Sequence, residues 1–251
     1  MKGRLIKLEV KTVEGFVIGE KPYGDTSKIL DVITKEYGIL SMLSKGSKRI
    51  KSDLRSVSQI FTYASFEISY KEGKLSTLIC ADVINPLINT KNSIERISYL
   101  NFISDLTKQV IKQSSNKNIY DLFIDSILKI EQGFDPMVIT NILEIKYLDY
   151  LGVAPYFDGC VVCENKNVIT LSPSKGGFVC KRHYDNDFIV DQKTIKIIRM
   201  LKYVDISKIT KLDLSDKVKL EINSFIDDYY DRYTGLYLKS KDFLKNIVKL
   251  V

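Results

Sequence analysis

Three of the four cysteines and the only histidine in the chain are spaced as metal ligands are. They form two pairs with two residues inside each pair and sixteen between the pairs, and they are Cys160, Cys163, Cys180 and His183. A C-x2-C turn brings two side chains to one ion without strain, and two such turns complete the tetrahedron that zinc prefers. We expect one structural zinc ion, because four protein ligands leave no coordination position open for catalysis.

The segment between the two pairs has the pattern of a small hairpin. Residues 168–171 and 177–179 resemble strands, and a Ser-Pro-Ser-Lys-Gly turn separates them. This arrangement is typical of zinc ribbons, so we place a zinc module, or zinc finger, at about residues 157–187. The alternative is a set of buried thiols with a surface histidine. Cys80 lies apart from the group, and we expect it to be a small core residue in a strand.

The second candidate site is the densest basic stretch, which has five cations within eleven residues. Lysine and arginine side chains there would bind phosphates and release condensed counterions, and the short residues Gly46 and Ser47 would let the backbone approach closely. The stretch lacks the G-x-x-x-x-G-K-[ST] pattern of nucleotide-hydrolysing loops. A solvated loop is the alternative interpretation. The five cations are Lys45, Lys48, Arg49, Lys51 and Arg55.

The composition favours an anionic partner. The 251 residues carry a formal charge of +7 with a pI near 9.0, which favours nucleic acid ahead of anionic lipid. The first ten residues lack the apolar core and cleavage site of a signal peptide, and no stretch approaches the roughly 20 apolar residues of a membrane span. We therefore expect a cytoplasmic protein with no membrane partner. Cysteines in that reducing compartment are more often metal ligands than disulfides.

The N-terminal part, residues 1–84, has the pattern of a small β-barrel. Short runs rich in β-branched and aromatic residues alternate with turn signals, and five strands in so short a chain suit a closed barrel. We predict an OB-fold nucleic-acid-binding domain, with an SH3-like barrel as the alternative. The expected strands are residues 12–19, 28–34, 38–44, 58–69 and 75–81.

The remainder, residues 85–251, has helical periodicity and begins at Asn85 and Pro86. Ser93 is an expected N-cap, and Asp135 followed by Pro136 should begin a further helix. The whole chain is thus predicted to be a multidomain α+β protein, with a five-stranded OB-fold β-barrel followed by an α-helical domain that carries the zinc finger. The expected helices are residues 93–113, 119–132, 136–150, 193–202, 216–233 and 242–249.

Several segments together resemble one bacterial family, the recombination mediator RecO, over most of the chain. In that family the first three mark the OB-fold, and the last two look like the surroundings of its zinc module. The segments are 21–30 (KPYGDTSKIL), 34–40 (TKEYGIL), 45–49 (KGSKR) with Lys51 and Ser52, 150–155 (YLGVAP) and 171–180 (LSPSKGGFVC).

The resemblance implies a DNA repair function and no enzymatic activity. A RecO-like protein would bind single- and double-stranded DNA, anneal complementary strands and, with RecR, help load RecA onto DNA coated by single-strand-binding protein. Carried over by position, the five cations of the basic stretch would contact DNA. Lys21, Lys28 and Lys35 on neighbouring turns are weaker candidates. A cysteine is frequent in the family where this chain has His183, a substitution that zinc tolerates.

Other readings of the sequence concern stacking, RNA and catalysis. Tyr23, Tyr37 or Phe61 could stack on unpaired bases, although an aromatic residue of this kind is more often part of the core. The main functional alternative is an RNA-binding zinc protein of translation or ribosome assembly. An enzyme would need a use for Asp227, Asp228 and Asp231, which we interpret as a solvated helical face because no nucleophile motif accompanies them.

Overall fold

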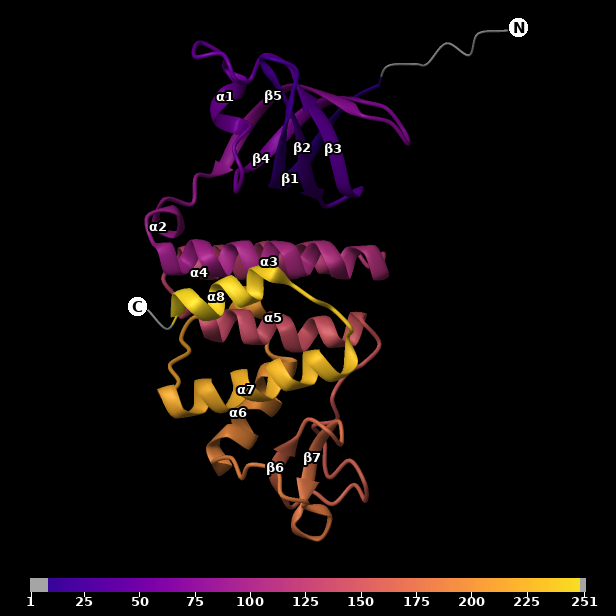
Figure 1. Ribbon diagram of the computed structural model, residues 1–251, viewed down its shortest axis with the longest axis vertical. Coiled ribbons are helices and arrows are strands. Elements are labelled where there is room, and N and C mark those ends of the chain that lie inside the picture. Colours follow the sequence, from indigo (N-terminus) through magenta and orange to yellow (C-terminus); the bar gives the residue numbers. More distant parts are fainter. Residues whose placement is uncertain (1–8, 249–251) are drawn as a thin grey trace, which may run out of the picture. The chain divides into compact units, whose positions relative to one another are not determined.

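The computed structural model describes residues 9–248 of the chain (Figure 1). The chain divides into two compact units, Met1–Ile88 and Asn89–Val251, and each is described by itself. The N-terminal unit is built on strands and the C-terminal unit on helices. Within the described residues, no helix combines the length and the apolar composition needed to cross a membrane.

Five strands close into a barrel in the N-terminal unit, in the order β1-β2-β3-β5-β4. The N-terminal half of β1 pairs with β4 and its C-terminal half with β2, so one long strand joins both sides of the barrel. The pairing of β3 with β5 is parallel and the others are antiparallel. This ring is OB-like, as the sequence predicts. The strands are β1 (Glu9–Tyr23), β2 (Ser27–Thr34), β3 (Gly38–Ser44), β4 (Tyr63–Tyr70) and β5 (Ser76–Asn85).

The barrel interior is filled by alternate residues of its strands, such as Leu30, Met42 and Phe66, each of which is 0% exposed. At Gly15, β1 passes so close to β2 that a Cβ atom would lie 2.6 Å from the Val32 side chain. The glycine at this position therefore allows β1 to pair with both β2 and β4.

One predicted strand begins too early. Residues 58–62 were expected to belong to the fourth strand, but they form a turn that follows the short helix α1 (Leu54–Val57). The Ser58 hydroxyl lies 2.7 Å from that of Ser44, and Phe61 has a φ of +64°, which is incompatible with a regular strand. Local strand propensity is thus overridden by the way this segment covers the barrel.

The helices of the C-terminal unit agree closely with those expected, and their caps are in place. The Ser93 hydroxyl accepts from the Arg96 N–H at 3.3 Å, and Asp135 accepts from the Met137 N–H at 2.9 Å. Short helices at α2 and at two 3-10 turns were not predicted. The elements are α2 (Ile88–Lys91), α3 (Ile94–Gln113), α4 (Asn118–Glu131), α5 (Pro136–Tyr150), β6 (Val168–Ser172), β7 (Gly177–Cys180), η1 (Lys181–His183), α6 (Gln192–Tyr203), η2 (Ile206–Lys208), α7 (Asp216–Tyr233) and α8 (Lys239–Val248).

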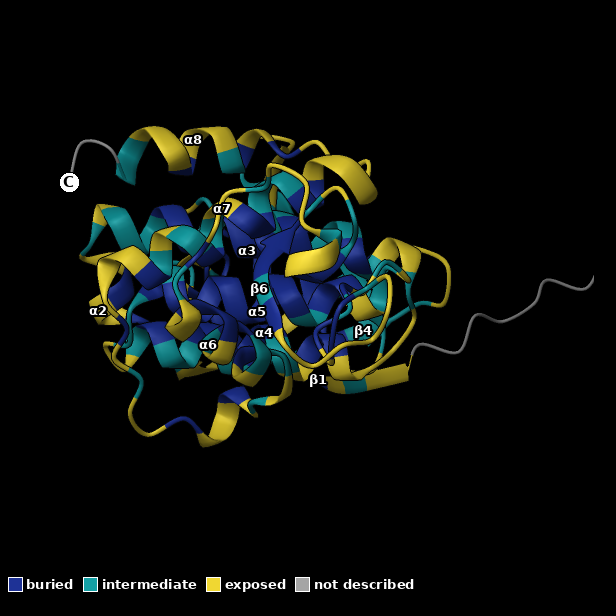
Figure 2. Ribbon diagram, turned by 90° about the horizontal axis from the view of Figure 1, so that it is seen from below, coloured by how far each residue is buried: buried dark blue, intermediate teal, exposed yellow. Residues whose placement is uncertain are grey.

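Helix α5 lies at the centre of the helical unit and is buried along most of its length (Figure 2). It contacts α3, α4, α6 and α7. Buried hydroxyls link it to its neighbours: Tyr147 lies 2.9 Å from the Thr107 hydroxyl, and Tyr230 donates to the Glu144 carbonyl at 2.8 Å. The polar groups of these aromatic side chains are thereby satisfied inside the core.

A buried ion cluster fastens α8 to this core. The Lys241 ammonium lies 2.9 Å from the Glu144 carboxylate and 2.7 Å from that of Asp227, and Lys245 reaches Asp227 at 3.0 Å. Burial raises the pKa of Glu144, and the nearby charge of Lys241 partly offsets this increase. The expectation that Asp227 belongs to a solvated face is wrong, because its side chain is only 18% exposed and is ion-paired.

Replacing Lys241 with methionine should destabilise the protein by about 3–5 kcal/mol, because the buried Glu144 carboxylate would lose its cation and Asp227 would keep only Lys245. The loss of Lys241 should raise the pKa of Glu144 further. The deficit relative to the wild type should then be fully present above that pKa and shrink as the pH falls through it, since a neutral carboxylic acid costs less to bury.

Urea denaturation at a series of pH values measures this effect. The matched control is Lys245→Met, whose side chain is 46% exposed and whose loss should cost about 1 kcal/mol or less. Equal losses for the two variants would show that burial does not set the strength of the Lys241 contacts.

Candidate functional site

The four predicted metal ligands converge on one point of the helical unit. Cys160 and Cys163 lie in the turn before β6, Cys180 ends β7, and His183 ends the 3-10 turn η1. Their ligand atoms all lie within 4.8 Å of one another. The antiparallel pairing of β6 with β7 places Val168 opposite Cys180, which brings the second pair back to the first.

Three of the six separations between ligand atoms match a tetrahedral site. The sulfurs of Cys163 and Cys180 are 3.8 Å apart, and His183 Nδ1 lies 3.6 Å from the Cys160 sulfur and 3.5 Å from the Cys180 sulfur. Tetrahedral zinc with bonds of about 2.3 Å to sulfur and about 2.0 Å to nitrogen would place two sulfurs about 3.8 Å apart, and a sulfur and a nitrogen about 3.5 Å apart. The cluster could therefore hold a metal ion with little rearrangement.

Backbone amides prepare the cluster for a cation. Burial raises the pKa of the Cys160 thiol, but hydrogen bonds from the backbone N–H groups of Val162, Cys180 and Cys163, and from His183, outweigh it and lower the pKa to about 6. At Cys163 an N–H group of Asn165 lowers the pKa, but burial and the neighbouring thiols raise it on balance. The first thiolate thus forms readily and the second is opposed by the first, a repulsion that a bound cation relieves.

Gly159 is part of the site although the ligand spacing does not reveal it. The backbone turns tightly here: the Glu164 N–H donates to the Cys160 carbonyl at 2.7 Å, and the Cys160 N–H donates to Asn165 at 2.9 Å. A Cβ atom on Gly159 would lie 2.6 Å from the Glu164 carbonyl oxygen. The only sequence signal for this requirement is a glycine directly before the first cysteine.

Cys80 is exposed, so its predicted place in the core is wrong. A register shift between Glu67 and Ile68 turns this part of β5 outward, and Cys80 pairs with Glu67 on the outer surface. Its sulfur lies 3.7 Å from the Glu67 carboxylate. Cys80 therefore lies in the barrel unit, outside the four-residue cluster in the helical unit.

Substituting Gly159 with alanine should distort the first ligand pair and cost about 1–3 kcal/mol, the usual range for overpacking. We expect a lower metal content per chain and a lower melting temperature. The control is Gly19→Ala in the barrel, where a Cβ atom would make only ordinary contacts, the nearest at 3.7 Å. Metal retention equal to that of Gly19→Ala would contradict the requirement.

The basic stretch is fastened to the turn between β1 and β2. The Lys48 N–H donates to the Thr26 carbonyl at 2.8 Å, and its ammonium reaches the Gly24 carbonyl at 3.2 Å. The Gly46 N–H donates to the Ser27 hydroxyl at 3.1 Å. Gly46 has a φ of +68°, a conformation that favours glycine. The predicted cations thus lie on an ordered loop beside a hairpin turn.

The structure separates the eight predicted DNA-contacting cations into unequal groups. Four of the basic stretch are exposed, and Lys48 is half-buried by its contacts with the turn. On the neighbouring strands, Lys21 is 75% exposed and lies 3.8 Å from the Asp31 carboxylate, whereas Lys28 is 19% exposed and pairs with Glu20 at 2.8 Å. Lys35 follows the opposite end of β2, far from this group. The exposed four are Lys45, Arg49, Lys51 and Arg55.

The three aromatic candidates also differ. Tyr23 at the hairpin tip is 52% exposed. Phe61 is buried, with its ring centroid 6.3 Å from that of Phe16, so it is a core residue and cannot stack on a base as it stands. Tyr37 packs against Tyr70 with ring centroids 4.8 Å apart. Of the three, only Tyr23 presents an open face next to the basic stretch.

The carboxylates of α7 do not form a metal site. Asp228 is ion-paired with Arg232 at 2.7 Å, and Asp231 is exposed. Among residues 9–248, the one group of three or more cysteine, histidine or acidic side chains able to hold a metal is the Cys160, Cys163, Cys180 and His183 cluster. The arrangement thus offers metal binding in one unit and a basic surface in the other.

Comparisons with known proteins match two parts of the chain to two family models. The family model described as "Recombination protein O N terminal" matches residues 8–87, and "Recombination protein O C terminal" matches residues 91–242. A similar protein from Halalkalibacterium halodurans, named DNA repair protein RecO, is 33% identical over 239 residues, or 93% of this chain and 94% of its own length. Proteins of the same name from Bacillus cytotoxicus and Bacillus cereus are 32% and 33% identical and cover 94% of this chain and 97% of their own.

Proposed function

Because the chain belongs to the RecO family of DNA repair and recombination proteins, we propose that it is a DNA-binding recombination mediator. It would bind single- and double-stranded DNA, anneal complementary strands and, with RecR, help load RecA onto strands coated by single-strand-binding protein. Family membership agrees with the expectation that the chain is not an enzyme. The protein would act in the cytoplasm.

The ordered basic stretch is the single observation that supports DNA binding most strongly. Its exposed cations are held on the OB-like barrel, where the loop bonds to the hairpin turn through Gly46 and Lys48. A loop that is already ordered loses less entropy when it binds a strand. The contacts would go to phosphates, which makes the binding independent of base sequence and sensitive to salt.

Annealing without ATP would follow from this surface. Two complementary strands repel each other, and a cluster of fixed cations that binds both would screen that repulsion. The exposed ring of Tyr23 beside the cations could stack on an unpaired base, a contact worth roughly 1–3 kcal/mol. The principal DNA-contacting residues would be Lys45, Lys48, Arg49, Lys51 and Arg55, with Lys21 secondary and Lys28 weakened by its pairing with Glu20.

The metal would be one structural zinc ion held by Cys160, Cys163, Cys180 and His183. The support is the ligand set of three sulfurs and one imidazole, together with separations that fit tetrahedral geometry. Zinc would fix the hairpin of β6 and β7 against the preceding turn. The closed ligand set gives it a role in folding and none in catalysis.

Reversing the charges of Lys48 and Arg49 together to glutamate should weaken DNA binding at low salt. Each phosphate contact on a single strand contributes about −0.7 to the slope of log K against log salt. The loss of two contacts should therefore make this negative slope shallower by about 1.4. Fluorescence anisotropy of a labelled oligonucleotide across a salt series measures it. An unchanged slope in a folded variant would rule out this surface.

Lys35→Glu provides the matched control, because Lys35 follows the other end of β2. It changes the net charge in the same direction and should leave the slope nearly unchanged. A loss equal to that of the double variant, per charge reversed, would mean that overall charge and not the basic stretch governs binding.

The annealing function itself is tested with single-strand-binding protein on both complementary oligonucleotides and no ATP. We expect annealing by the wild type and a marked loss in the Lys48 and Arg49 double variant. A competition between RNA and DNA strands of matched sequence separates this function from that of an RNA-binding zinc protein. Preference for RNA with no annealing of coated DNA would favour the latter.

Metal analysis of the purified protein should find one zinc per chain, and Cys180→Ser should lose it together with part of the thermal stability. Chelation should reproduce the loss of stability in the wild type, because metal binding and the folding of the module are coupled. The exposed Cys80→Ser is the control and should retain the metal. A full zinc content in Cys180→Ser would show that this residue is not a ligand.

A further inference from the structure

A pocket of about 430 Å³ lies between the zinc-module hairpin and α7. Its inner wall is apolar and includes Leu171, Val190 and Phe225, which are buried. Two further apolar residues at the pocket are largely exposed, Phe188 at 73% and Leu220 at 58%. The volume falls in the range of ligand-binding pockets.

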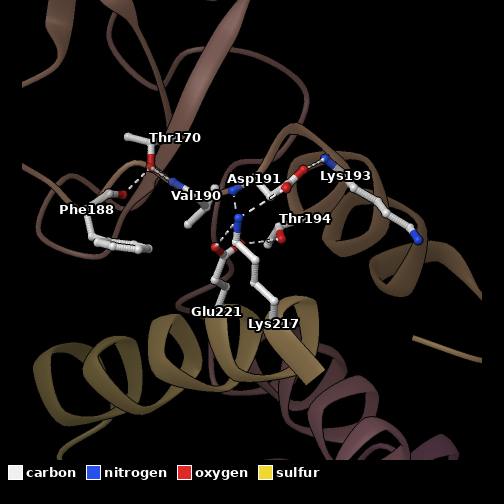
Figure 3. A network of polar contacts seen from close by, with 8 residues as sticks. All are labelled: Thr170, Phe188, Val190, Asp191, Lys193, Thr194, Lys217 and Glu221. Carbon is white, nitrogen blue, oxygen red and sulfur yellow. Dashed lines mark hydrogen bonds and ion pairs between the residues drawn. The ribbon is translucent and has the colours of Figure 1, made fainter. Parts of the chain in front are cut away.

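One carboxylate oxygen in this pocket has an unmet hydrogen-bonding capacity. Glu221 has a side chain only 7% exposed, and its Oε2 accepts from the Asp191 N–H at 3.0 Å and from the Thr194 hydroxyl (Figure 3). Its Oε1 is buried and accepts no hydrogen bond from any residue between 9 and 248. The Lys217 ammonium is 4.0 Å from this oxygen, 66% exposed, and closer to Asp191, at 3.3 Å.

A second carboxylate at the same pocket repeats this pattern. Asp187 accepts from the Ser172 hydroxyl at 2.9 Å through Oδ1, whereas its buried Oδ2 lacks a hydrogen-bond donor in the described part of the chain. The third acid of the pocket, Asp228, is already paired with Arg232, which also experiences the charge of Asp187. Two buried acceptors at this pocket, Glu221 Oε1 and Asp187 Oδ2, thus have no hydrogen-bond donor among the described residues, and the nearest cation to the first is Lys217 at 4.0 Å.

The segment that carries Asp187 is held in place. The Thr170 hydroxyl donates to the Phe188 carbonyl and accepts from the Val190 N–H at 3.2 Å (Figure 3). The backbone at Phe188 and Val190 is therefore held beside β6. A pocket with rigid walls does not need to order itself when a ligand enters.

The chemistry of the missing partner follows from these groups. A buried acceptor without a donor costs about 1–3 kcal/mol, so two at one pocket favour a ligand that carries several N–H donors and a positive charge. The apolar walls favour a hydrocarbon stem behind that charge. A guanidinium group provides five donors in one plane and can reach two carboxylates, which a single ammonium does less well.

We propose that this pocket binds an arginine side chain of a partner protein, with an apolar residue next to that arginine resting on Phe188 and Leu220. The exposed rim favours a protein segment over a free amine, because a small cation would leave both of these apolar side chains in water. The acidic side chains of the pocket would attract the guanidinium group, although the chain as a whole carries a formal charge of +7. The pocket lies in the helical unit, so the proposal requires no DNA contact by the basic stretch of the barrel.

The test uses the full-length, metal-loaded chain and three synthetic peptides, acetyl-GRFG-amide, acetyl-GEFG-amide and acetyl-GRSG-amide, with binding followed by amide NMR shifts. We expect the first to shift signals of Val190, Glu221 and Ser224. The second should not bind, and the third should bind at least threefold more weakly. No shift with the first peptide, or equal binding of the charge-reversed one, would overturn the proposal.

Variants locate the interaction. Glu221→Gln removes the charge and should weaken binding of acetyl-GRFG-amide at least fivefold, whereas Asp231→Asn on the exposed face of α7 should leave it unchanged. Ser224→Phe would fill the pocket while keeping the Glu221 carboxylate and should abolish binding, so it serves if Glu221→Gln misfolds. Wild-type affinity in folded Ser224→Phe would exclude this pocket.

Two small probes distinguish other occupants. Butylguanidinium should bind at least tenfold more weakly than acetyl-GRFG-amide, since it lacks the apolar neighbour. Equal affinity would make the pocket a site for free cations and overturn the proposal of a protein partner.

Magnesium chloride should not displace the peptide. Displacement at millimolar concentration, with the same signals shifted, would indicate a metal site in place of the arginine site.

Discussion

A helix that has no solvent-facing stripe constrains the whole helical unit. Residues 138–145 of α5 are buried without interruption, which covers every direction around the helix axis, so other helices must surround it. The only carboxylate in that run belongs to Glu144, and burial makes its charge costly. Lys241 offsets that cost from α8, and Tyr230 of α7 satisfies the backbone carbonyl of the same residue. One acidic residue in the central helix thus helps to hold α8, together with the hydrogen bond from the Ser240 hydroxyl to Asp105 of α3.

Local signals in the sequence predict most of the elements but not how they meet. Ser93 and Asp135 mark helix starts because a cap acts within one turn, and α7 begins and ends where its periodicity predicts. The predicted start of the fourth strand was wrong because contacts with β1 impose the turn at Phe61. The Phe61 N–H donates to the Val17 carbonyl of β1 at 2.8 Å. Cys80 was misplaced since a single bulge reverses the face of a strand, and no local pattern reveals it.

The candidate sites follow the same division. The cluster of candidate metal ligands could be predicted because its chemistry is rare and its spacing local, whereas Gly159 supports it through a close backbone approach that depends on the folded turn. The basic stretch could be predicted from the density of lysine and arginine residues in one short segment. Its attachment to the hairpin turn, the pairing of Lys28 and the separate position of Lys35 required the barrel. The acidic pocket could not be predicted, because Asp187 and Glu221 are distant in sequence. Which hydrogen-bond donors surround their carboxylates depends on the folded structure.

The two fastenings of the helical unit differ in when they can form during synthesis. All four candidate metal ligands lie within residues 160–183, so a metal centre there would need only a short, contiguous piece of chain. Glu144 and Lys241 are 97 residues apart, so their ion pair joins distant parts of the chain. Since the N-terminal parts of a protein emerge first, the four candidate ligands are synthesised before α8, and an ion could bind them while Glu144 still lacks the Lys241 ammonium. Glu144 therefore gains this ion pair only after α8 has been synthesised.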